Sequence, residues 1–337
     1  MRQVSTSCTQ RLLGHLHRLT GRATAPRELL VLAGYDDFLT KRDLRYLLGR
    51  YRQVVLLPRR GTDALLLEQT VQAVWRGHFA ADLVSNPGYD HALGIDWRAL
   101  TPTSPRLRYL AVPDFCERVL RKVYVPADAA ERNARLVVPR PLSGPARVLK
   151  RGLDLLLGLL LLLPAVLIGA LGTGVVRRQS PGPLLYPQRR VGQAGREFTC
   201  WKFRSMHPDA EAAGAAFARR IDPRTFPFGA WLRAARLDEL PQVLNVLRGE
   251  LSLVGPRPER RVFTDWFEEA VPHYAQRYAA RPGLTGYAQV RYGYGVGRQG
   301  ARHKLMYDLY YLHHWSVALE IRILLDTVRT VLRGGGH

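Results

Sequence analysis

The sequence predicts an α/β protein in two parts: a small Rossmann-like parallel-sheet domain, then a mainly helical α+β domain that carries a membrane segment. The 337 residues fit two ordinary domains of roughly 100–200 residues each. Short apolar runs alternate with amphipathic segments in the first part, and one long apolar segment separates it from the second. The composition, 47% hydrophobic and 23% charged, excludes a disordered or collagen-like chain.

Short apolar runs and amphipathic segments follow one another through the first part. We expect strands at 28–34, 53–58 and 107–112, and helices at 41–52 and 62–75. This alternation is typical of βαβ units and predicts a small parallel sheet. No glycine-rich phosphate loop follows these strands, since the first ends in the sequence GYDDF. A structural or regulatory role is therefore favoured over nucleotide binding.

One apolar segment dominates the organisation of the chain. Residues 152–176 form a run of 25 residues in which Asp154 is the single charge. A helix of that length reaches about 37 Å, which exceeds a bilayer core of about 30 Å. Pro164 lies near its middle, and basic pairs flank both ends. A kinked spanning helix satisfies these observations, and so does a helix broken at Leu163–Pro164 that returns to the same side.

The formal net charge is +22, from 50 basic and 28 acidic residues, and only five of the basic residues are lysine. Guanidinium groups match phosphates and diphosphates in bidentate geometry. The charge therefore predicts a polyanionic partner: nucleic acid, an anionic lipid surface or a diphosphate substrate. Aromatic and basic residues do not alternate on one face as in single-strand binders, so no specific nucleic acid is expected.

Two adjacent carboxylates, Asp238 and Glu239, shortly precede Pro241. Proline is favoured in the first turn of a helix, which would place both carboxylates near a helix start, where the dipole favours their charged forms. One could act as a nucleophile. The other could hold Mg²⁺, which proteins bind through one or two carboxylates plus substrate phosphates. Capping of the helix is the other interpretation.

Three basic residues occupy positions suited to phosphate. Pro256 and Pro258 flank Arg257, and this stiff backbone would hold its guanidinium in a fixed geometry. Lys202 and Arg204 are two residues apart, so they lie on the same side of an extended strand, as a cationic clamp would. A surface turn and a solvated strand face are the corresponding structural interpretations.

Residues 317–333 predict a basic amphipathic helix near the C-terminus. Its apolar positions recur with helical spacing, and arginines occupy the remaining face. Such a helix can lie in the headgroup plane of a membrane. An ordinary packed surface helix explains the same pattern.

Several short motifs lie between residue 150 and the C-terminus. They are KRGLD (150–154), the apolar segment with its central proline, SPGP (180–183), QRRVG (188–192), KFRSM (202–206), LDELPQ (237–242), NVLRGELSLVGPRP (245–258), RPGLTGYAQV (281–290) and YDLYY (307–311). In identity and order they resemble the bacterial sugar transferase family, the monotopic polyprenyl-phosphate phosphoglycosyl transferases. The chain looks most like the exopolysaccharide-synthesis branch, in which a nucleotide-binding-like domain commonly precedes the catalytic part.

The resemblance implies a domain plan. Residues 1–140 would form a nucleotide-binding-like domain with a structural or regulatory role, and 141–149 a linker. A re-entrant membrane helix would occupy 150–178, broken at Leu163–Pro164, with both ends cytoplasmic. The catalytic domain would occupy 179–337 and end in an interfacial amphipathic helix. The protein would then be monotopic, at the cytoplasmic face of the bacterial inner membrane.

The resemblance also implies a reaction. A sugar-1-phosphate would pass from a UDP-sugar to undecaprenyl phosphate, giving undecaprenyl-diphosphate-sugar and UMP, the initiating step of exopolysaccharide or related glycoconjugate synthesis. Asp238 would be the nucleophile of a covalent phosphosugar intermediate, Glu239 would be the Mg²⁺ ligand, and Arg257 would bind phosphate. Contacts to the donor would come from Lys202, Arg204 and Arg233.

The chain departs from the family pattern at Leu163, where a serine often precedes the proline. A different class of function, a catalytically retired scaffold tethered to the membrane, would keep the arginine-rich surface. The intact Asp238–Glu239 pair and Arg257 argue against it. The identity of the sugar and the oligomeric state, a homo-oligomer included, stay open.

Overall fold

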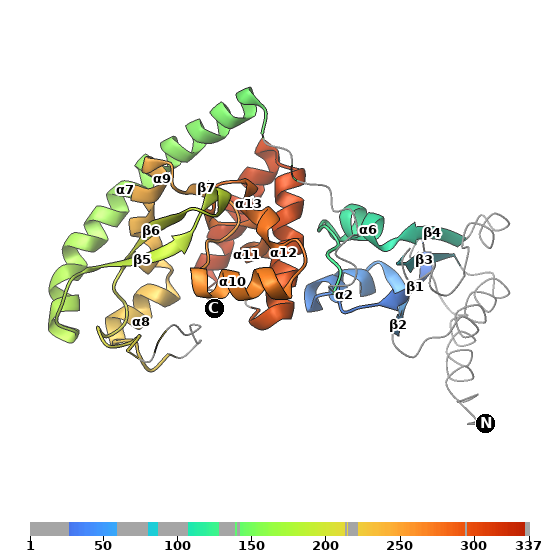
Figure 1. Ribbon diagram of the computed structural model, residues 1–337, viewed down its shortest axis with the longest axis horizontal. Helices are drawn as coiled ribbons and strands as arrows, with labels where there is room; N and C mark the ends of the chain where they lie inside the picture. Colours follow the sequence, from blue (N-terminus) through green and yellow to red (C-terminus); the bar gives the residue numbers. More distant parts are fainter. Residues whose placement is uncertain are drawn as a thin grey trace. The chain divides into compact units, whose positions relative to one another are not determined.

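The chain divides into two compact units, Met1–Ala127 and Asp128–His337, each with its own buried core. Figure 1 shows the computed structural model. It describes residues 27–58, 80–86, 107–127, 139, 142–212, 214, 222–293 and 295–333.

A four-stranded parallel sheet with the order β2–β1–β3–β4 forms the centre of the first unit. The strands are β1 (Arg27–Tyr35), β2 (Tyr51–Pro58), β3 (Ala81–Ser85) and β4 (Leu107–Ala111). β1 pairs on both sides and buries residues 29–33, which accounts for its unbroken apolar run. The predicted parallel sheet is confirmed. Its Rossmann-like arrangement stays a prediction, because the helix expected at 62–75 lies outside the described residues.

Helix α2 (Lys41–Leu48) connects β1 to β2. It begins at a capping box, in which the Thr40 hydroxyl accepts from the Asp43 backbone N–H and the Asp43 carboxylate accepts from the Thr40 backbone N–H. We expected this helix to continue to residue 52. It ends earlier because Gly49 caps it and the chain enters β2 two residues later.

Strand β3 is absent from the sequence prediction, because Asp82 interrupts its short apolar run. In the structure Asp82 is fully buried and accepts hydrogen bonds from Tyr51 at 2.5 Å and Arg108 at 2.8 Å. These partners come from β2 and β4, so the carboxylate is satisfied only once the sheet has formed. After β4 the chain continues through α6 (Val112–Phe115) and the π-helical turn η2 (Cys116–Leu120).

The second unit combines several helices with two small sheets. β5 (Leu185–Val191) pairs antiparallel with β6 (Glu197–Phe203), and β7 (Ser252–Val254) pairs parallel with β8 (Gly283–Thr285). The helices are α7 (Gly144–Gln179), α8 (Pro227–Ala234), α9 (Val243–Arg248), α10 (Arg261–Ala270), α11 (Tyr287–Arg291), α12 (Gly297–His313) and α13 (Val317–Leu332), with 3-10 turns η4 (Gln193–Gly195), η5 (Leu237–Gln242) and η6 (Tyr274–Ala279). This composition agrees with the expected mainly helical α+β domain.

Helix α7 contains the whole apolar segment and lies along one edge of the unit, beside α9 (Figure 1). Among the described residues it is the one helix long and apolar enough to cross a membrane. The sequence predicts a break at Leu163–Pro164, but the helix is continuous through both residues. Proline lacks the N–H that would bond to the carbonyl four residues earlier, while the adjacent turns keep their hydrogen bonds. One such loss does not end a helix of 36 residues.

The KRGLD motif fastens the start of α7 to the rest of the unit. Lys150 Nζ lies 2.5 Å from Glu320 of α13, and Arg151 donates to the last carbonyls of α9 at 2.6 and 2.8 Å. Asp154 Oδ1 accepts from the backbone N–H of Leu253 at 2.8 Å. Lys150, Asp154 and Glu320 are all buried, so each charge has a specific partner or hydrogen bond within the fold.

Candidate active site

A change of backbone direction at Arg236 presents the Asp238–Glu239 pair. Helix α8 ends at Ala234, and Arg236 then adopts a left-handed conformation (φ 59°). The turn η5 begins immediately afterwards and carries both carboxylates in its first turn. The prediction that they lie near a helix start is confirmed, although that helix is a 3-10 turn preceding α9. Each residue is only 7% exposed.

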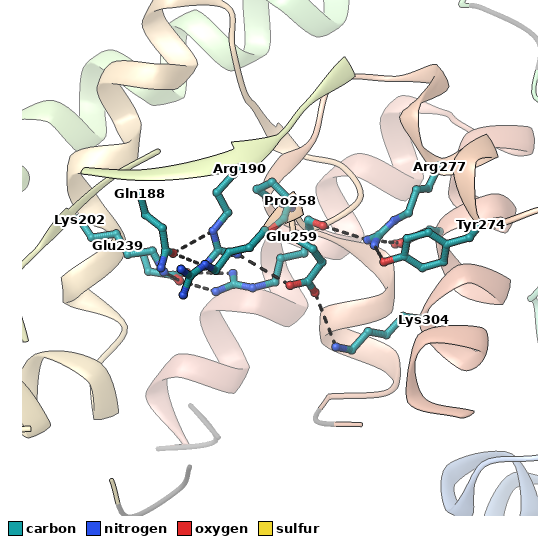
Figure 2. Close-up of polar contacts among 12 residues, drawn as sticks. Gln188, Arg190, Lys202, Glu239, Pro258, Glu259, Tyr274, Arg277 and Lys304 are labelled. Carbon is teal, nitrogen blue, oxygen red and sulfur yellow. Dashed lines mark hydrogen bonds and ion pairs between the residues drawn. The ribbon is translucent and has the colours of Figure 1, made fainter. Parts of the chain in front are cut away.

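Two cations bind Glu239 (Figure 2). Lys202 Nζ, at the end of β6, lies 3.0 Å from Oε1. Arg257 Nη1 lies 3.1 Å from Oε2, and its Nη2 donates to Oε1, so the pair is bidentate. Both cationic side chains are at least three-quarters buried. Neither a solvated strand face for Lys202 nor a surface turn for Arg257 describes these positions.

The two adjacent carboxylates differ in charge state. Burial raises the pKa of Asp238 to about 6, and the negative charge of Glu239 adds to this effect, while Lys202 and Arg233 oppose it. Burial acts in the same direction on Glu239, but Arg257 and Lys202 outweigh it and hold the pKa of that carboxyl well below its usual range. Glu239 is therefore a fixed anion, and Asp238 can exchange a proton near neutral pH.

Asp238 faces a cavity of about 1150 Å³. Within the part of the chain that the structure describes, no hydrogen bond or ion pair reaches its carboxylate, whereas both oxygens of Glu239 accept from cations. Arg233 of α8 lines the same cavity, as do Lys202 and Arg257. An anion that entered would meet several positive groups around one unengaged carboxylate.

Arg204 does not join Lys202 at the carboxylates. Its guanidinium donates to the Ser180 hydroxyl at 2.6 Å, to the Ser180 carbonyl at 2.5 Å and to the Pro183 carbonyl at 2.6 Å. β6 ends at Phe203, so the two-residue alternation that would align Arg204 with Lys202 no longer applies. Arg204 lines the cavity but is engaged in holding the SPGP turn that follows α7. Leu163 and Pro164, in the middle of α7, do not line this cavity.

A second group of charged side chains supports residues 255–260, which connect β7 to α10 and are called the Arg257 loop. Arg190 Nη1 donates to the Pro258 carbonyl at 2.5 Å, and Arg277 Nη2 donates to the Arg257 carbonyl at 2.9 Å. Arg277 pairs in turn with Asp308 of α12. Glu259 lies 3.9 Å from Arg190 and 3.8 Å from Lys304 (Figure 2).

The prediction from sequence omitted these residues, although Arg190 belongs to the QRRVG motif and Asp308 to YDLYY. Charged residues inside such motifs were the available signal. Their separation along the chain concealed the fact that they meet at one loop.

The Asp238–Glu239 pair, called the dyad below, offers carboxylate oxygens of the kind that bind Mg²⁺. Asp238 offers unengaged oxygens beside the cavity, and Oε2 of Glu239 accepts one hydrogen bond, which leaves a lone pair. Among the described residues no cluster of three or more acidic, histidine or cysteine side chains could enclose a metal. The arrangement therefore fits a cation that takes one or two carboxylates and completes its shell with substrate oxygens and water.

Comparison with known proteins identifies the family. Residues 145–334 match the bacterial sugar transferase family, and the chain belongs to it. The "UDP-glucose:undecaprenyl-phosphate glucose-1-phosphate transferase" of Caulobacter vibrioides is 43% identical over 189 residues, which make up 54% of this chain and 69% of that protein. The "exopolysaccharide production protein PSS" of Rhizobium leguminosarum bv. phaseoli is 42% identical over 202 residues, 56% of this chain and 97% of that protein.

A longer relative shows the extent of the similarity. The "UDP-N-acetylgalactosamine-undecaprenyl-phosphate N-acetylgalactosaminephosphotransferase" of Aeromonas hydrophila is 42% identical over 209 residues. These residues are 61% of this chain but 48% of that protein, so the match spans about half the length of this relative. The family match begins at residue 145 and so covers the second unit alone.

Proposed function

We propose that this protein is a phosphoglycosyl transferase that moves a sugar-1-phosphate from a UDP-sugar to undecaprenyl phosphate. The observation that carries the proposal is that the two carboxylates of the dyad differ in their contacts and in their pKa. Asp238 is unengaged at a cationic cavity and its pKa is raised to about 6, while Glu239 is fixed by Lys202 and Arg257. Relatives named as transferases from UDP-glucose and UDP-N-acetylgalactosamine to undecaprenyl phosphate support the substrate class.

The transfer proceeds in two displacements. An oxygen of ionised Asp238 attacks the phosphorus that bears the sugar, and the bond from that phosphorus to the bridging oxygen breaks. UMP leaves with the bonding electrons, and the enzyme holds an aspartyl phosphosugar. A phosphate oxygen of undecaprenyl phosphate then attacks the same phosphorus, and Asp238 departs as a carboxylate. With two steps, undecaprenyl phosphate never has to attack the diphosphate of the donor directly.

The surrounding residues hold the donor and offset its charge. Arg233 and Lys202 line the cavity next to Asp238, where the diphosphate must lie. Arg257 keeps Glu239 in place, and its remaining donors can reach phosphate oxygens. Glu239 would hold Mg²⁺ together with substrate oxygens, and the ion would supply charge neutralisation on the diphosphate.

Both ends of α7 are fastened to the same unit. Lys150 at its start binds Glu320 and the Val254 carbonyl, and Ser180 at its end binds Arg204. The middle of the helix exposes large apolar side chains such as Leu159, Leu163 and Leu167. A folded unit holding both ends does not readily bridge a bilayer. This supports a monotopic attachment at the cytoplasmic face of the inner membrane, as the family resemblance implies, although α7 is not broken at Pro164.

A nucleotide-release assay tests the proposal. Protein in nanodiscs receives UDP-glucose, UDP-N-acetylgalactosamine or other UDP-sugars, with Mg²⁺ and undecaprenyl phosphate. We expect UMP release that requires lipid for turnover, and a covalent phosphosugar adduct visible by intact-protein mass spectrometry. Asp238→Asn should abolish both, and Asp265→Asn, an exposed aspartate on α10, should change neither. Release of UDP would contradict the proposal, and silence with every donor would favour the retired scaffold.

A further inference from the structure

An exposed apolar stripe runs along α13. Ile321, Leu325, Val328 and Leu332 follow one another at helical spacing, and their exposed fractions range from 48% to 80%. A soluble surface helix of this kind normally turns such residues toward a core. All four line the cavity that contains Asp238.

Helix α7 contributes apolar side chains to the same cavity. Leu157, Leu160 and Leu161 line it, and Leu160 is 64% exposed. Two kinds of side chain therefore line the cavity: the dyad with its surrounding cations, and leucine, isoleucine and valine from α7 and α13. A donor consisting of a sugar and a nucleotide has no group that needs the apolar region.

Helices α7 and α13, which supply the apolar walls of the cavity, are held together at one end. Glu320, one residue before Ile321, binds Lys150 of α7 at 2.5 Å and also accepts from Tyr311 and Trp315, each at 2.9 Å. Figure 1 shows α7 and α13 in the same unit, and this buried cluster ties them together near the start of α7. The arrangement is thus built into the fold.

We propose that the polyprenyl chain of the acceptor lies against the α13 stripe and the Leu157–Leu161 side of α7, with its phosphate directed to Asp238. This rests on the proposed function, and it deepens it by assigning the chain-binding walls. An acceptor with one anionic end and a long apolar chain matches a cavity that is lined by both cationic and apolar side chains. Because bilayer lipid is as apolar as leucine, the walls serve mainly to position the phosphate rather than to extract the chain from lipid.

The alternative is that bilayer lipid covers these apolar walls. Acceptors with polyprenyl chains of different length distinguish the two possibilities. The variant Leu325→Asn/Val328→Thr makes the stripe polar and keeps the number of heavy atoms in each side chain. We expect it to raise the KM for undecaprenyl phosphate about five- to tenfold, and to leave the KM for geranyl phosphate, whose chain is too short to follow the stripe, nearly unchanged. The control is Leu171→Asn, on α7 outside the cavity, where the leucine is 79% exposed.

The first displacement, in which the enzyme reacts with the UDP-sugar, serves as the reference against which each variant is compared. Exchange of labelled UMP into UDP-sugar needs no acceptor, so its rate reports whether each variant is folded and whether the first displacement occurs. Absence of exchange in the natural protein would overturn the proposed function, and this inference with it. With exchange intact, an equal rise of KM for both acceptors would overturn the chain-binding assignment. So would an equal effect of Leu171→Asn, since the stripe would then simply rest in lipid.

Discussion

Arg277 donates a hydrogen bond from Nη2 to the backbone carbonyl of Arg257 at 2.9 Å. The same nitrogen lies 2.9 Å from Oδ2 of Asp308, and both side chains are almost fully buried. Since Arg257 in turn binds Glu239, a continuous set of contacts leads from α12 to Glu239, the neighbour in sequence of the candidate nucleophile Asp238. Arg277 is a positioning residue in this scheme, because it acts on the dyad only through the Arg257 loop.

Replacing Arg277 tests this role. Arg277→Gln leaves Asp308 buried without its cation, which should lower the free energy of unfolding by roughly 3–5 kcal/mol. Displacing the Arg257 guanidinium by a fraction of an ångström should reduce kcat for UMP release by about 10- to 100-fold. Adding Asp308→Asn removes the unpaired charge and should restore much of the stability but not the activity. Full activity in a stable double variant would contradict the positioning role.

The acid limb of the pH profile depends on Asp238. As the proposed nucleophile, Asp238 must be ionised, and burial and Glu239 raise its pKa to about 6. The rate of adduct formation should therefore fall about tenfold per pH unit below 6 and level off above about 7. Single-turnover measurements between pH 4.5 and 8.5 check this. A profile that is flat through pH 6 would show that Asp238 does not titrate as the nucleophile.

The raised pKa of Asp238 also predicts that ionisation of this carboxylate, which the proposed catalysis requires, lowers the stability of the fold. At pH 7.5 the buried Asp238 carboxylate is ionised in the folded state at a cost that the unfolded chain does not bear. Asp238→Asn removes this cost and should raise the Tm by several degrees at pH 7.5. The gain should shrink as the pH falls through 6 toward 4, because natural Asp238 then becomes protonated in the fold. A gain independent of pH would point to another cause.

Glu239 should influence both the metal response and the acid limb. Glu239→Gln removes the charge that helps raise the pKa of Asp238, and it releases Lys202 and Arg257. The midpoint of the acid limb should move to lower pH. The Mg²⁺ concentration for half-maximal activity should rise at least severalfold if Glu239 is a ligand. An unchanged metal response would refute that role while leaving the pH prediction standing.

Local patterns in the sequence indicated the elements but not the contacts between distant residues. The dyad, Arg257 and Lys202 were predicted because each lies in a distinctive local sequence, and the structure places all of them at one cavity. Arg204 was misplaced because the strand ends one residue before it. Arg277 carried no local signal, since its role depends on a carbonyl twenty residues earlier in the chain. Pro164 was expected to end a helix that neighbouring hydrogen bonds continue.

The fastening of both ends of α7 to one unit gives a topological prediction. Cysteines introduced by Val148→Cys and Arg178→Cys lie at exposed positions near the two ends of the helix. In a background with Cys8 replaced by serine, both should resist a membrane-impermeant maleimide in spheroplasts and react in inverted vesicles, because the proposed attachment places both ends on the cytoplasmic side. Cys116 and Cys200 are buried and should stay unlabelled in each case. Labelling of the two introduced cysteines from opposite sides would establish a spanning helix, and would require the contacts of Lys150 or Arg204 to break in the membrane.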